Sequence, residues 1–502
     1  MKRFFISVIV SMGCFMAHAQ SSITIPTVNI IPGSEKSVDV TIANGTDYTA
    51  FQFDVALPTG VSLKSAAFKS KGDSREITSG KVGDKYRVLS YAKDNAKLGA
   101  TEVLSLTFEA ATTFAADGEG TVAKGDIVLV DPEGKQPEPE TVTGGTVDFK
   151  VTEGVSVTIG ANGVTTIVSD KDLDFTDSEV KAYIATGYDY GENNIMLTRV
   201  KDVPAKTPIL LMGEPSGETP YKIPVTTSHT YYPDNFLKGK ASEAVAIDNS
   251  GDYMNMKLKS GKFIALEATS WEAGKCYLQV PVAAKVASAA GDAFKFTMGA
   301  NGTKSYTGKY DLDFEGVDGL KAYIVTGYDK DGTVWLTRVN KVSCKTPLVL
   351  MGKASTEYEV PSKALKFSYV NMLRGDAEAV TTIQNQTTEW KNLILKKGKF
   401  TGLGTAESGD IAAGASYLPV PLSFIPASSR GEFANDPQYN FAEAEVITIK
   451  AIIGGEDDGT TGIKRVDSEV DDDVWYNLKG QRIDTPTRKG LYIKNGKKVV
   501  VK

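Results

Sequence analysis

The sequence predicts an all-β chain: an antiparallel sandwich, two tandem copies of an antiparallel β-domain, and a small C-terminal meander. Three observations carry this prediction. Apolar and polar residues alternate through the N-terminal quarter, a stretch of about 140 residues occurs twice in succession, and Gly, Pro, Asn and Asp separate the short apolar runs. Period-two alternation broken by turn residues is typical of antiparallel sheets with one buried face.

Residues 1–19 have the pattern of a cleaved signal peptide. Lys2-Arg3 forms a basic start, Phe4 to Val10 an apolar stretch, and Ala17-His18-Ala19 a small-x-small cleavage site. Lipidation of Cys14 is the alternative, since a glycine precedes this cysteine. No later run reaches the ~18 apolar residues of a membrane span, so we expect a secreted chain with no transmembrane segment.

Residues 20–150 predict the sandwich. Strict alternation runs through Val38 to Ile42, Phe51 to Leu57 and Leu104 to Phe108. The acidic, proline-rich segment 131–145 predicts an extended linker or an exposed loop, and we place the domain boundary near residue 150. In the alternative, Thr146 to Val151 is the last strand of this first domain.

This region resembles cohesin-like domains, over about a quarter of the chain. The resemblance rests on a strand pattern carried by Gly33, Ser37-Val38-Asp39-Val40, Tyr48 to Val55, Leu57-Pro58-Thr59-Gly60-Val61, Leu89-Ser90-Tyr91 and Val103 to Phe108. It implies a jelly-roll sandwich, a shape shared with some carbohydrate-binding modules. Cohesins bind dockerins through one sheet face, but this chain has no dockerin-like duplicated calcium loop, so dockerin binding is not implied.

The repeats occupy residues 151–296 and 297–450. Four motifs return in the second copy: Lys181-Ala182-Tyr183-Ile184 as Lys321-Ala322-Tyr323-Ile324, Thr186-Gly187-Tyr188-Asp189 as Thr326-Gly327-Tyr328-Asp329, Leu197-Thr198-Arg199-Val200 as Leu336-Thr337-Arg338-Val339, and Lys206-Thr207-Pro208 as Lys345-Thr346-Pro347. We expect the copies to superpose and each to fold alone. They resemble a domain of unsettled function that is common in large secreted proteins of Bacteroidetes.

The two copies also test for chemistry, because a catalytic residue that both need should occur in both. His229 is the only histidine beyond the signal peptide and has no histidine counterpart. Cys276 is matched by Ser416 and Cys344 by Ala205, so the repeat needs neither thiol. A Cys276–Cys344 disulfide is allowed in an oxidising compartment, but spacing cannot establish it. We predict that the chain is not an enzyme and has no cofactor.

Acidic side chains offer two candidate cation sites, each with a structural alternative. Asp329-Lys330-Asp331-Gly332 begins like a calcium loop but lacks a glutamate at the twelfth position, which favours a hairpin turn. Asp172 with Asp174, and Asp311 with Asp313, would share a strand face. The Leu and Phe residues around them favour an amphipathic edge, so no metal site is predicted.

Aromatic residues decide whether sugar binding is expected. Three tryptophans exchange with other residues between the copies: Trp335 with Met196, Trp271 with Ile411, and Trp390 with Tyr253. Such exchange is what a core position tolerates, and it argues against a stacking platform. Tyr188 and Tyr328, at a predicted turn between Gly and Asp, are the candidate exposed rings for ligand contact, with hairpin packing as the alternative.

The C-terminal region predicts an acidic flexible linker at 451–473 and a β-tail at 474–502. The tail resembles a shortened sorting domain of the type IX secretion kind, through Tyr476-Asn477-Leu478-Lys479-Gly480-Gln481-Arg482 and Lys489-Gly490-Leu491-Tyr492-Ile493. Asn495-Gly496 is a hairpin signal. The resemblance implies export to or across the outer membrane; the alternative is a plain β-tail that closes the preceding domain.

Together these features resemble a secreted multidomain surface protein of the Bacteroidetes type. We predict a non-enzymatic role in adhesion or protein assembly, with a carbohydrate-binding accessory protein of a polysaccharide-processing system as the alternative. The expected partner is a protein or glycan at the cell surface. A formal net charge of -6 with dispersed basic residues argues against nucleic acid.

Overall fold

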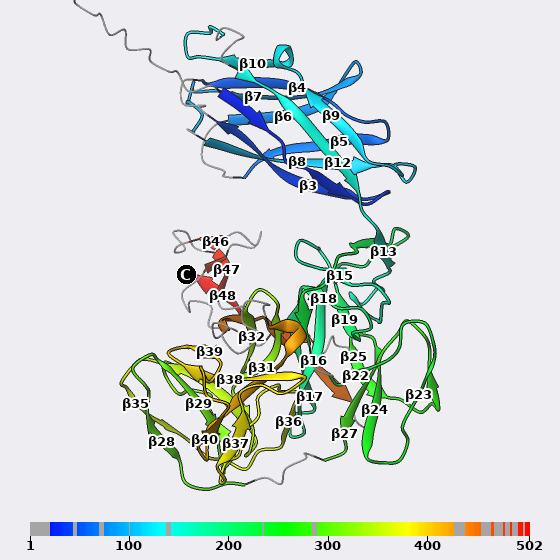
Figure 1. The fold of residues 1–502 in the computed structure, drawn as a ribbon. Coiled ribbons are helices and arrows are strands. Elements are labelled where there is room, and N and C mark those ends of the chain that lie inside the picture. The colour runs from blue at the N-terminus through cyan, green and yellow to red at the C-terminus, as the bar shows by residue number, and fades with distance from the viewer. Residues whose placement is uncertain are drawn as a thin grey trace, which may run out of the picture. The chain divides into compact units, whose positions relative to one another are not determined.

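The computed structural model describes residues 21–43, 48–69, 75–99, 101–136, 142–232, 235–283, 289–425 and 437–452, together with five short strands between 463 and 501. The regular elements among them are strands, apart from the 3₁₀ turns η2 (Lys124–Asp126) and η4 (Leu422–Phe424), so the predicted all-β class is confirmed. The chain divides into two compact units, Met1–Val155 and Ser156–Lys502 (Figure 1). No helix in the described part of the chain is long and apolar enough to span a membrane. The expected signal peptide lies outside these residues.

The first unit is a two-sheet sandwich. One sheet has the order β11-β1-β3-β8-β5, and the other has the order β2-β12-β9-β4-β7-β6, with β10 paired to β4. The strands are β1 (Ser21–Thr24), β2 (Val28–Ile30), β3 (Glu35–Ala43), β4 (Ala50–Ala56), β5 (Val61–Phe68), β6 (Arg75–Val82), β7 (Lys85–Ala92), β8 (Thr101–Ala110), β9 (Gly118–Val122), β10 (Ile127–Val130), β11 (Val142–Thr143) and β12 (Gly145–Val151). Their inward residues form one core, in which the rings of Phe108 and Phe149 meet edge to face at 5.2 Å.

Two alternatives left open by the sequence are decided here. Residues 146–151 lie in β12, which pairs with β2 and β9 and is the last strand of the sandwich. The described parts of the segment 131–145, residues 131–136 and 142–145, lie within the first unit, so the segment does not link the two units.

The two repeats share one strand order within the second unit. The first sheet runs β14-β19-β16-β17-β43-β25-β24-β27-β22, and the second runs β29-β34-β31-β32-β42-β39-β38-β41. The first copy contributes β14 (Val164–Ile167), β16 (Lys181–Asp189), β17 (Asn194–Val200), β19 (Ile209–Met212), β22 (Leu237–Lys238), β24 (Tyr253–Lys259), β25 (Lys262–Ala265) and β27 (Tyr277–Pro281). The second contributes β29 (Thr303–Thr307), β31 (Leu320–Asp329), β32 (Thr333–Val339), β34 (Pro347–Gly352), β38 (Trp390–Lys396), β39 (Lys399–Thr401) and β41 (Tyr417–Pro421).

Small two-stranded sheets flank both copies. They are β13 (Gly154–Val157) with β20 (Tyr221–Pro224), β15 (Leu173–Asp174) with β18 (Asp202–Val203), β23 (Val245–Ala246) with β26 (Ser270–Trp271), β28 (Phe294–Thr297) with β35 (Glu357–Val360), β30 (Leu312–Asp313) with β33 (Lys341–Val342), and β37 (Thr381–Gln384) with β40 (Ser408–Ile411). Equivalent hairpins are formed by β24 with β25 in the first copy and by β38 with β39 in the second.

One central strand of each repeat sheet comes from residues 438–452, near the end of the second repeat. β42 (Gln438–Ala444) pairs with β32 and β39 in the second copy. The next strand, β43 (Val446–Ile452), lies between β17 and β25 of the first copy. Ile447, Ile449 and Ala451 on β43 are buried in the same core as Tyr188, Leu197 and Phe263. The first repeat is therefore completed by a strand from the end of the second repeat.

The copies also exchange short strands. β36 (Phe367–Tyr369) of the second copy pairs with β16, and β21 (Thr230–Tyr231) of the first copy pairs with β31. A Cβ at Gly187 would lie 2.9 Å from the ring of Tyr369, and a Cβ at Gly327 would lie 2.9 Å from the ring of Tyr232. The glycine of the repeated Thr-Gly-Tyr-Asp motif thus makes room for a tyrosine from the other copy.

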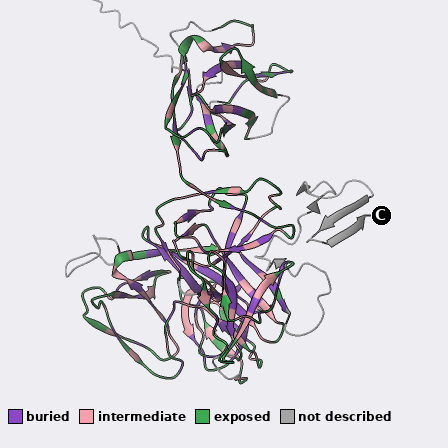
Figure 2. Cartoon of the chain, turned by 90° about the vertical axis from the view of Figure 1, so that its right-hand side faces the viewer, coloured by how far each residue is buried: buried purple, intermediate pink, exposed green. Residues whose placement is uncertain are grey.

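Four buried threonines join the two copies. The Oγ1 atoms of Thr186 and Thr198 are 2.7 Å apart, those of Thr198 and Thr337 are 3.0 Å apart, and those of Thr337 and Thr326 are 2.7 Å apart. Thr198 and Thr337 occupy equivalent positions, so the contact is self-complementary like a two-fold interface. Figure 2 shows that this second unit is buried along its central strands and exposed mainly in its loops.

The C-terminal tail contains β45 (Trp475–Tyr476), β46 (Arg482–Ile483), β47 (Gly490–Lys494) and β48 (Lys497–Val501) in one sheet of order β46-β45-β47-β48. Within the expected linker 451–473, β44 (Ile463–Arg465) pairs with β43. The predicted turn at Asn495-Gly496 lies outside the described residues.

Candidate binding sites

Tyr188 and Tyr328 are core residues, so the expectation of exposed rings at these positions is wrong. Their exposed fractions are 1% and 0%. The pairing of β16 with β17 shifts register at Thr186, and this bulge turns Tyr188 to the same core as Tyr183 and Ala185. Its hydroxyl donates to Oδ1 of Asn193 at 3.1 Å, and burial raises the pKa of Tyr188 to about 12.

The acidic side chains of these motifs accept hydrogen bonds from backbone N–H groups. Oδ1 of Asp329 accepts hydrogen bonds from the N–H groups of Asp331 at 3.0 Å and Thr333 at 2.9 Å, which is the hairpin turn favoured by the sequence. No group of three or more His, Cys, Asp or Glu side chains suited to a metal ion occurs among the described residues.

The amphipathic edge expected around the paired aspartates is wrong for the second copy, because Asp311 and Asp313 are buried there, with Asp311 at 0% exposure. The carboxylate of Asp311 accepts three backbone hydrogen bonds, from Cys344 at 2.7 Å, Leu365 at 2.8 Å and Ala289 at 3.0 Å. In the first copy, Asp172 accepts from Ala205 at 2.6 Å and from Ser228 at 2.8 Å. Both aspartates therefore hold the segments that lead into the exchanged strands.

The residues that occur in one copy only, His229, Cys276 and Cys344, form no candidate site with the other described residues. His229 is exposed, and its backbone N–H donates to Oδ2 of Asp202 at 2.9 Å. Cys276 and Cys344 are buried free thiols, so the allowed disulfide is not formed. The Sγ of Cys276 is 3.4 Å from the carbonyl oxygen of Ile209, and the Oγ of its counterpart Ser416 donates to the carbonyl of Leu348 at 3.2 Å.

We expect neither thiol to react with a thiol reagent in the native protein. Both side chains are nearly inaccessible, and burial raises the pKa of Cys276 to about 12 and also raises that of Cys344. A colorimetric thiol assay on the mature protein should detect two thiols only after denaturation. Rapid labelling of the native protein, or no free thiol in denaturant, would contradict this assignment.

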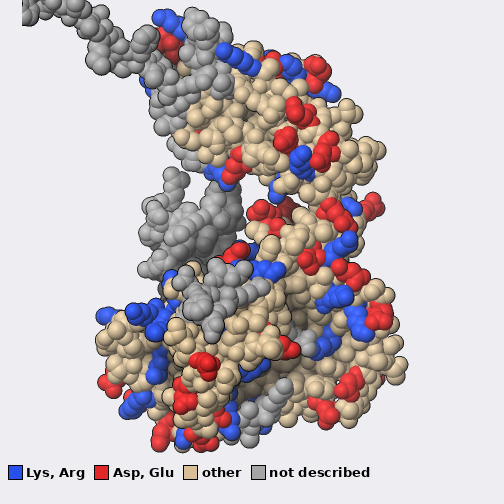
Figure 3. Space-filling view, viewed as in Figure 1, with Lys and Arg blue, Asp and Glu red and all other residues tan. Residues whose placement is uncertain are grey.

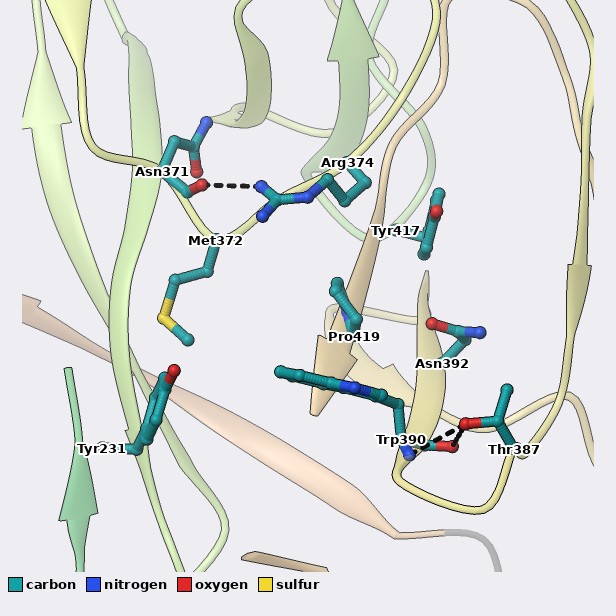
Figure 4. Close-up of a pocket in the computed structure, with 9 residues that line it drawn as sticks. All are labelled: Tyr231, Asn371, Met372, Arg374, Thr387, Trp390, Asn392, Tyr417 and Pro419. Atoms are coloured by element: carbon teal, nitrogen blue, oxygen red, sulfur yellow. Dashed lines mark hydrogen bonds between the residues drawn. The ribbon is translucent and has the colours of Figure 1, made fainter. Parts of the chain in front are cut away.

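A hollow of about 400 Å³ opens at one edge of the second repeat. Its lining is mainly aromatic and polar, and it consists of Tyr231, Asn371, Met372, Arg374, Thr387, Trp390, Asn392, Tyr417 and Pro419. Tyr231 belongs to the exchanged strand β21, so both copies contribute to the hollow. Figure 4 shows the flat indole ring of Trp390 across the hollow from Arg374, with Met372 and Tyr231 along one side.

Local hydrogen bonds fix the two principal residues. The backbone N–H of Trp390 donates to Oγ1 of Thr387 at 3.0 Å, which closes the turn before β38. The backbone of Arg374 exchanges hydrogen bonds with Tyr417, at 2.9 and 2.8 Å. The Nη1 atom of Arg374 donates to the carbonyls of Asn371 and Leu373, at 2.9 and 3.0 Å. The backbone at Trp390 and the guanidinium of Arg374 are therefore held in place before any ligand binds.

A similar arrangement recurs in the first copy. Lys238 stands where the second copy has Arg374, and Tyr253 stands where it has Trp390; Tyr253 pairs with Pro281 as Trp390 pairs with Pro421. Both Lys238 and Tyr253 line a second hollow, of about 860 Å³. Tyr253 is 39% exposed and Trp390 is half-buried, so the expectation that this pair is a core position is wrong.

The first unit offers a different surface, the outer face of its larger sheet. We call this surface the β7 face and define it by Gln52 and Asp54 on β4, Thr78 and Val82 on β6, Arg87, Leu89 and Tyr91 on β7, and Val128 and Val130 on β10. These residues alternate with the core residues of the same strands, so they share one face of the sheet. Gln52 stands opposite Leu89 and Val128, Asp54 opposite Arg87, and Thr78 opposite Leu89. Val82 and Tyr91 are 45% and 42% exposed, and they are the large exposed apolar residues of the described part of this unit.

An ion pair lies at the centre of the β7 face. Nε and Nη2 of Arg87 donate to Oδ1 and Oδ2 of Asp54, at 2.7 and 2.8 Å. This hydrogen bonding raises the pKa of Arg87. A two-point contact between a buried carboxylate and a half-buried guanidinium fixes both side chains. Elsewhere charges are interspersed, and the view in Figure 3 shows no large area of one sign.

No known protein family matches the chain, and no curated protein does. Solved structures with similar folds are mainly cohesins. A non-cellulosomal cohesin from Archaeoglobus fulgidus is 17% identical over 26% of this chain and 89% of its own, with a TM-score of 0.21. A cohesin from Clostridium acetobutylicum is 16% identical over 26% and 90%, with a TM-score of 0.22. The cohesin module of a family 33 glycoside hydrolase from Clostridium perfringens is 13% identical over 27% and 98%, with a TM-score of 0.23.

These likenesses concern the fold alone. The chain is a multidomain all-β protein, and its first unit is a two-sheet sandwich.

Proposed function

We propose that this chain is a secreted, non-enzymatic surface protein that mediates adhesion or protein assembly. It is exported to or across the outer membrane, with or without attachment to the cell surface. The observation that carries the binding role is the β7 face. It combines exposed apolar side chains with a preformed ion pair on a sheet surface.

The composition of this face fits a protein partner. Tyr and Arg are enriched where protein interfaces gain most of their free energy, and apolar side chains supply the area that is removed from water. Tyr91 lies next to Leu89 along β7, and its hydroxyl donates to Glu76 at 2.8 Å. Arg87 is already paired with Asp54, so a partner would cover this pair without leaving either charge unpartnered. A sheet face of this kind needs no rearrangement to bind.

The opposite outer face supplies a matched control. It carries Thr41, Ser105 and Thr107 at outward positions of β3 and β8, with ion pairs such as Lys69 to Asp39. Most of its outward side chains are polar or charged, so it offers less apolar area to a partner than the β7 face does.

Replacing Val82, Leu89 and Tyr91 together with serine should lower binding of the mature protein to its producing cells by about tenfold or more. The thermal melt should change little, because these side chains lie outside the core. The effect is measured as the binding of labelled protein to intact cells, with a T41A/S105A double variant as the control.

Protease treatment of the cells should remove binding if the partner is a protein. Equal binding by the triple variant and the parent would contradict the role of the β7 face. Loss of binding after glycan oxidation alone would favour the second candidate function, carbohydrate binding. That candidate is favoured by one observation, the hollow that Trp390 and Arg374 line.

A further inference from the structure

The lining of the hollow in the second repeat has the chemistry of a sugar site. A pyranose ring presents C–H groups on its faces and hydroxyls around its edge, so it needs a flat apolar surface bordered by polar groups. Trp390 supplies the flat surface, and no ring contact to it occurs among the described residues. The volume of about 400 Å³ lies within the range of small-molecule sites.

Unpaired polar groups border this surface. The Nδ2 atom of Asn392 donates to the carbonyl of Gln384 at 2.8 Å, which leaves its Oδ1 without a partner among the described residues. Figure 4 shows this oxygen on the side of Asn392 that faces Pro419 and Trp390. Tyr417 lines the same hollow, and its hydroxyl likewise has no described partner. These atoms can accept from or donate to sugar hydroxyls.

Arg374 makes the site selective for charge. Its Nη1 atom is used by the carbonyls of Asn371 and Leu373, whereas Nε and Nη2 have no partner among the described residues. The Nε–Nη2 edge of a guanidinium is a two-point donor that matches a carboxylate. Among the described residues that line the hollow, Arg374 is the only charged one, so none of them offers a carboxylate that competes for that edge.

We infer that this hollow binds a hexuronic acid residue of an acidic polysaccharide. The pyranose ring lies on Trp390, its carboxylate meets Arg374, and Asn392 and Tyr417 contact its hydroxyls. The inference rests on the carbohydrate-binding candidate above and names its site and ligand class. The repeated pairing of a cation with an aromatic ring, Lys238 with Tyr253, marks the equivalent position of the first copy.

The test uses the full mature chain and three immobilised hexuronate polymers: polygalacturonate, alginate and hyaluronan. Carboxyl-reduced polygalacturonate serves as the neutral match. We expect retardation of the parent protein in a native gel by at least one acidic polymer, and about tenfold weaker binding to the reduced polymer. W390A should lose binding by about tenfold or more, and R374K should also weaken it, since lysine keeps the charge but lacks the two-point edge.

Matched variants remove similar groups elsewhere. Y310A removes an exposed ring, and K353A removes an exposed cation; neither residue lines the hollow. Both should bind like the parent, as should the triple variant of the β7 face. Thermal melts on all variants check folding, and the comparison of acidic with reduced polymer on the parent needs no variant at all.

Each remaining outcome overturns the inference in a defined way. Binding to no polymer removes both the hexuronate and the carbohydrate function, while cell binding through the β7 face is unaffected. Equal binding to acidic and reduced polymer that W390A abolishes keeps a glycan site but rejects the acid. Binding that W390A leaves unchanged places the site elsewhere. Competition by poly-glutamate, with no competition by a uronate oligomer, identifies an acidic peptide site.

Discussion

Truncation of the chain after Glu445 should abolish cooperative unfolding of the first repeat, whereas truncation after Ile452 should preserve it. The shorter chain loses β43, which lies between β17 and β25 and joins the two halves of the sheet. It also loses Ile447 and Ile449 from the core that contains Leu197 and Phe263. A sheet interrupted at its centre exposes two unpaired edges as well as apolar surface.

Circular dichroism melts and hydrogen exchange on the two truncations measure this difference. In the full chain, I449A should cost about 2–5 kcal/mol of unfolding free energy, the usual range for a buried isoleucine cut to alanine. Residues 151–296 expressed alone should likewise fail to melt cooperatively, contrary to what the repeat pattern in the sequence predicts. A cooperative melt of that fragment would show that β43 is dispensable.

The substitution D311A is expected to cause the second large loss of stability. The substitution removes the acceptor of three backbone N–H groups, from Ala289, Cys344 and Leu365, in a site with no exposed area. Each buried donor left unsatisfied costs about 1–3 kcal/mol, so a loss of about 3 kcal/mol or more is expected. Leu365 leads into the exchanged strand β36, so its protection against hydrogen exchange should fall as well.

Urea unfolding of D311A beside D318A measures the effect. Asp318 is exposed, so its replacement should change stability by no more than about 0.5 kcal/mol. D311N keeps one acceptor oxygen and should fall between the parent and D311A. Equal stability of D311A and D318A would show that water replaces the carboxylate.

The local alternation of apolar and polar residues was sufficient to predict the strands of the first unit. Alternation in Phe51 to Leu57 and Leu104 to Phe108 predicted β4 and β8, because one face of each is buried in the sandwich core. The repeated motifs predicted two similar sheets, because equal sequences satisfy equal hydrogen-bonding and burial needs. The turn expected at Tyr188 was wrong, because β16 continues to Asp189 and the bulge at Thr186 directs the ring into the core.

The candidate sites were much less predictable. The hollow collects Tyr231 from the first copy with Arg374, Trp390 and Tyr417 from separate segments of the second. Trp390 in the second copy is replaced by Tyr253 in the first. This exchange of aromatic residues is equally compatible with a core position and with a ligand-binding position. Only the exposure of these rings distinguishes the two.

The sequence by itself determined the strand content, the repeated architecture, and the lack of a histidine or cysteine that both copies share. These properties follow from neighbours along the chain and from comparison of the copies. The tertiary structure decided the order in which strands meet. It placed β43 in the first repeat, laid Tyr369 over Gly187, and brought Arg374 opposite Trp390. Strands that are distant in the sequence pair when their apolar faces are buried in one core and their backbone N–H and C=O groups bond to each other. No local sequence pattern contains this information.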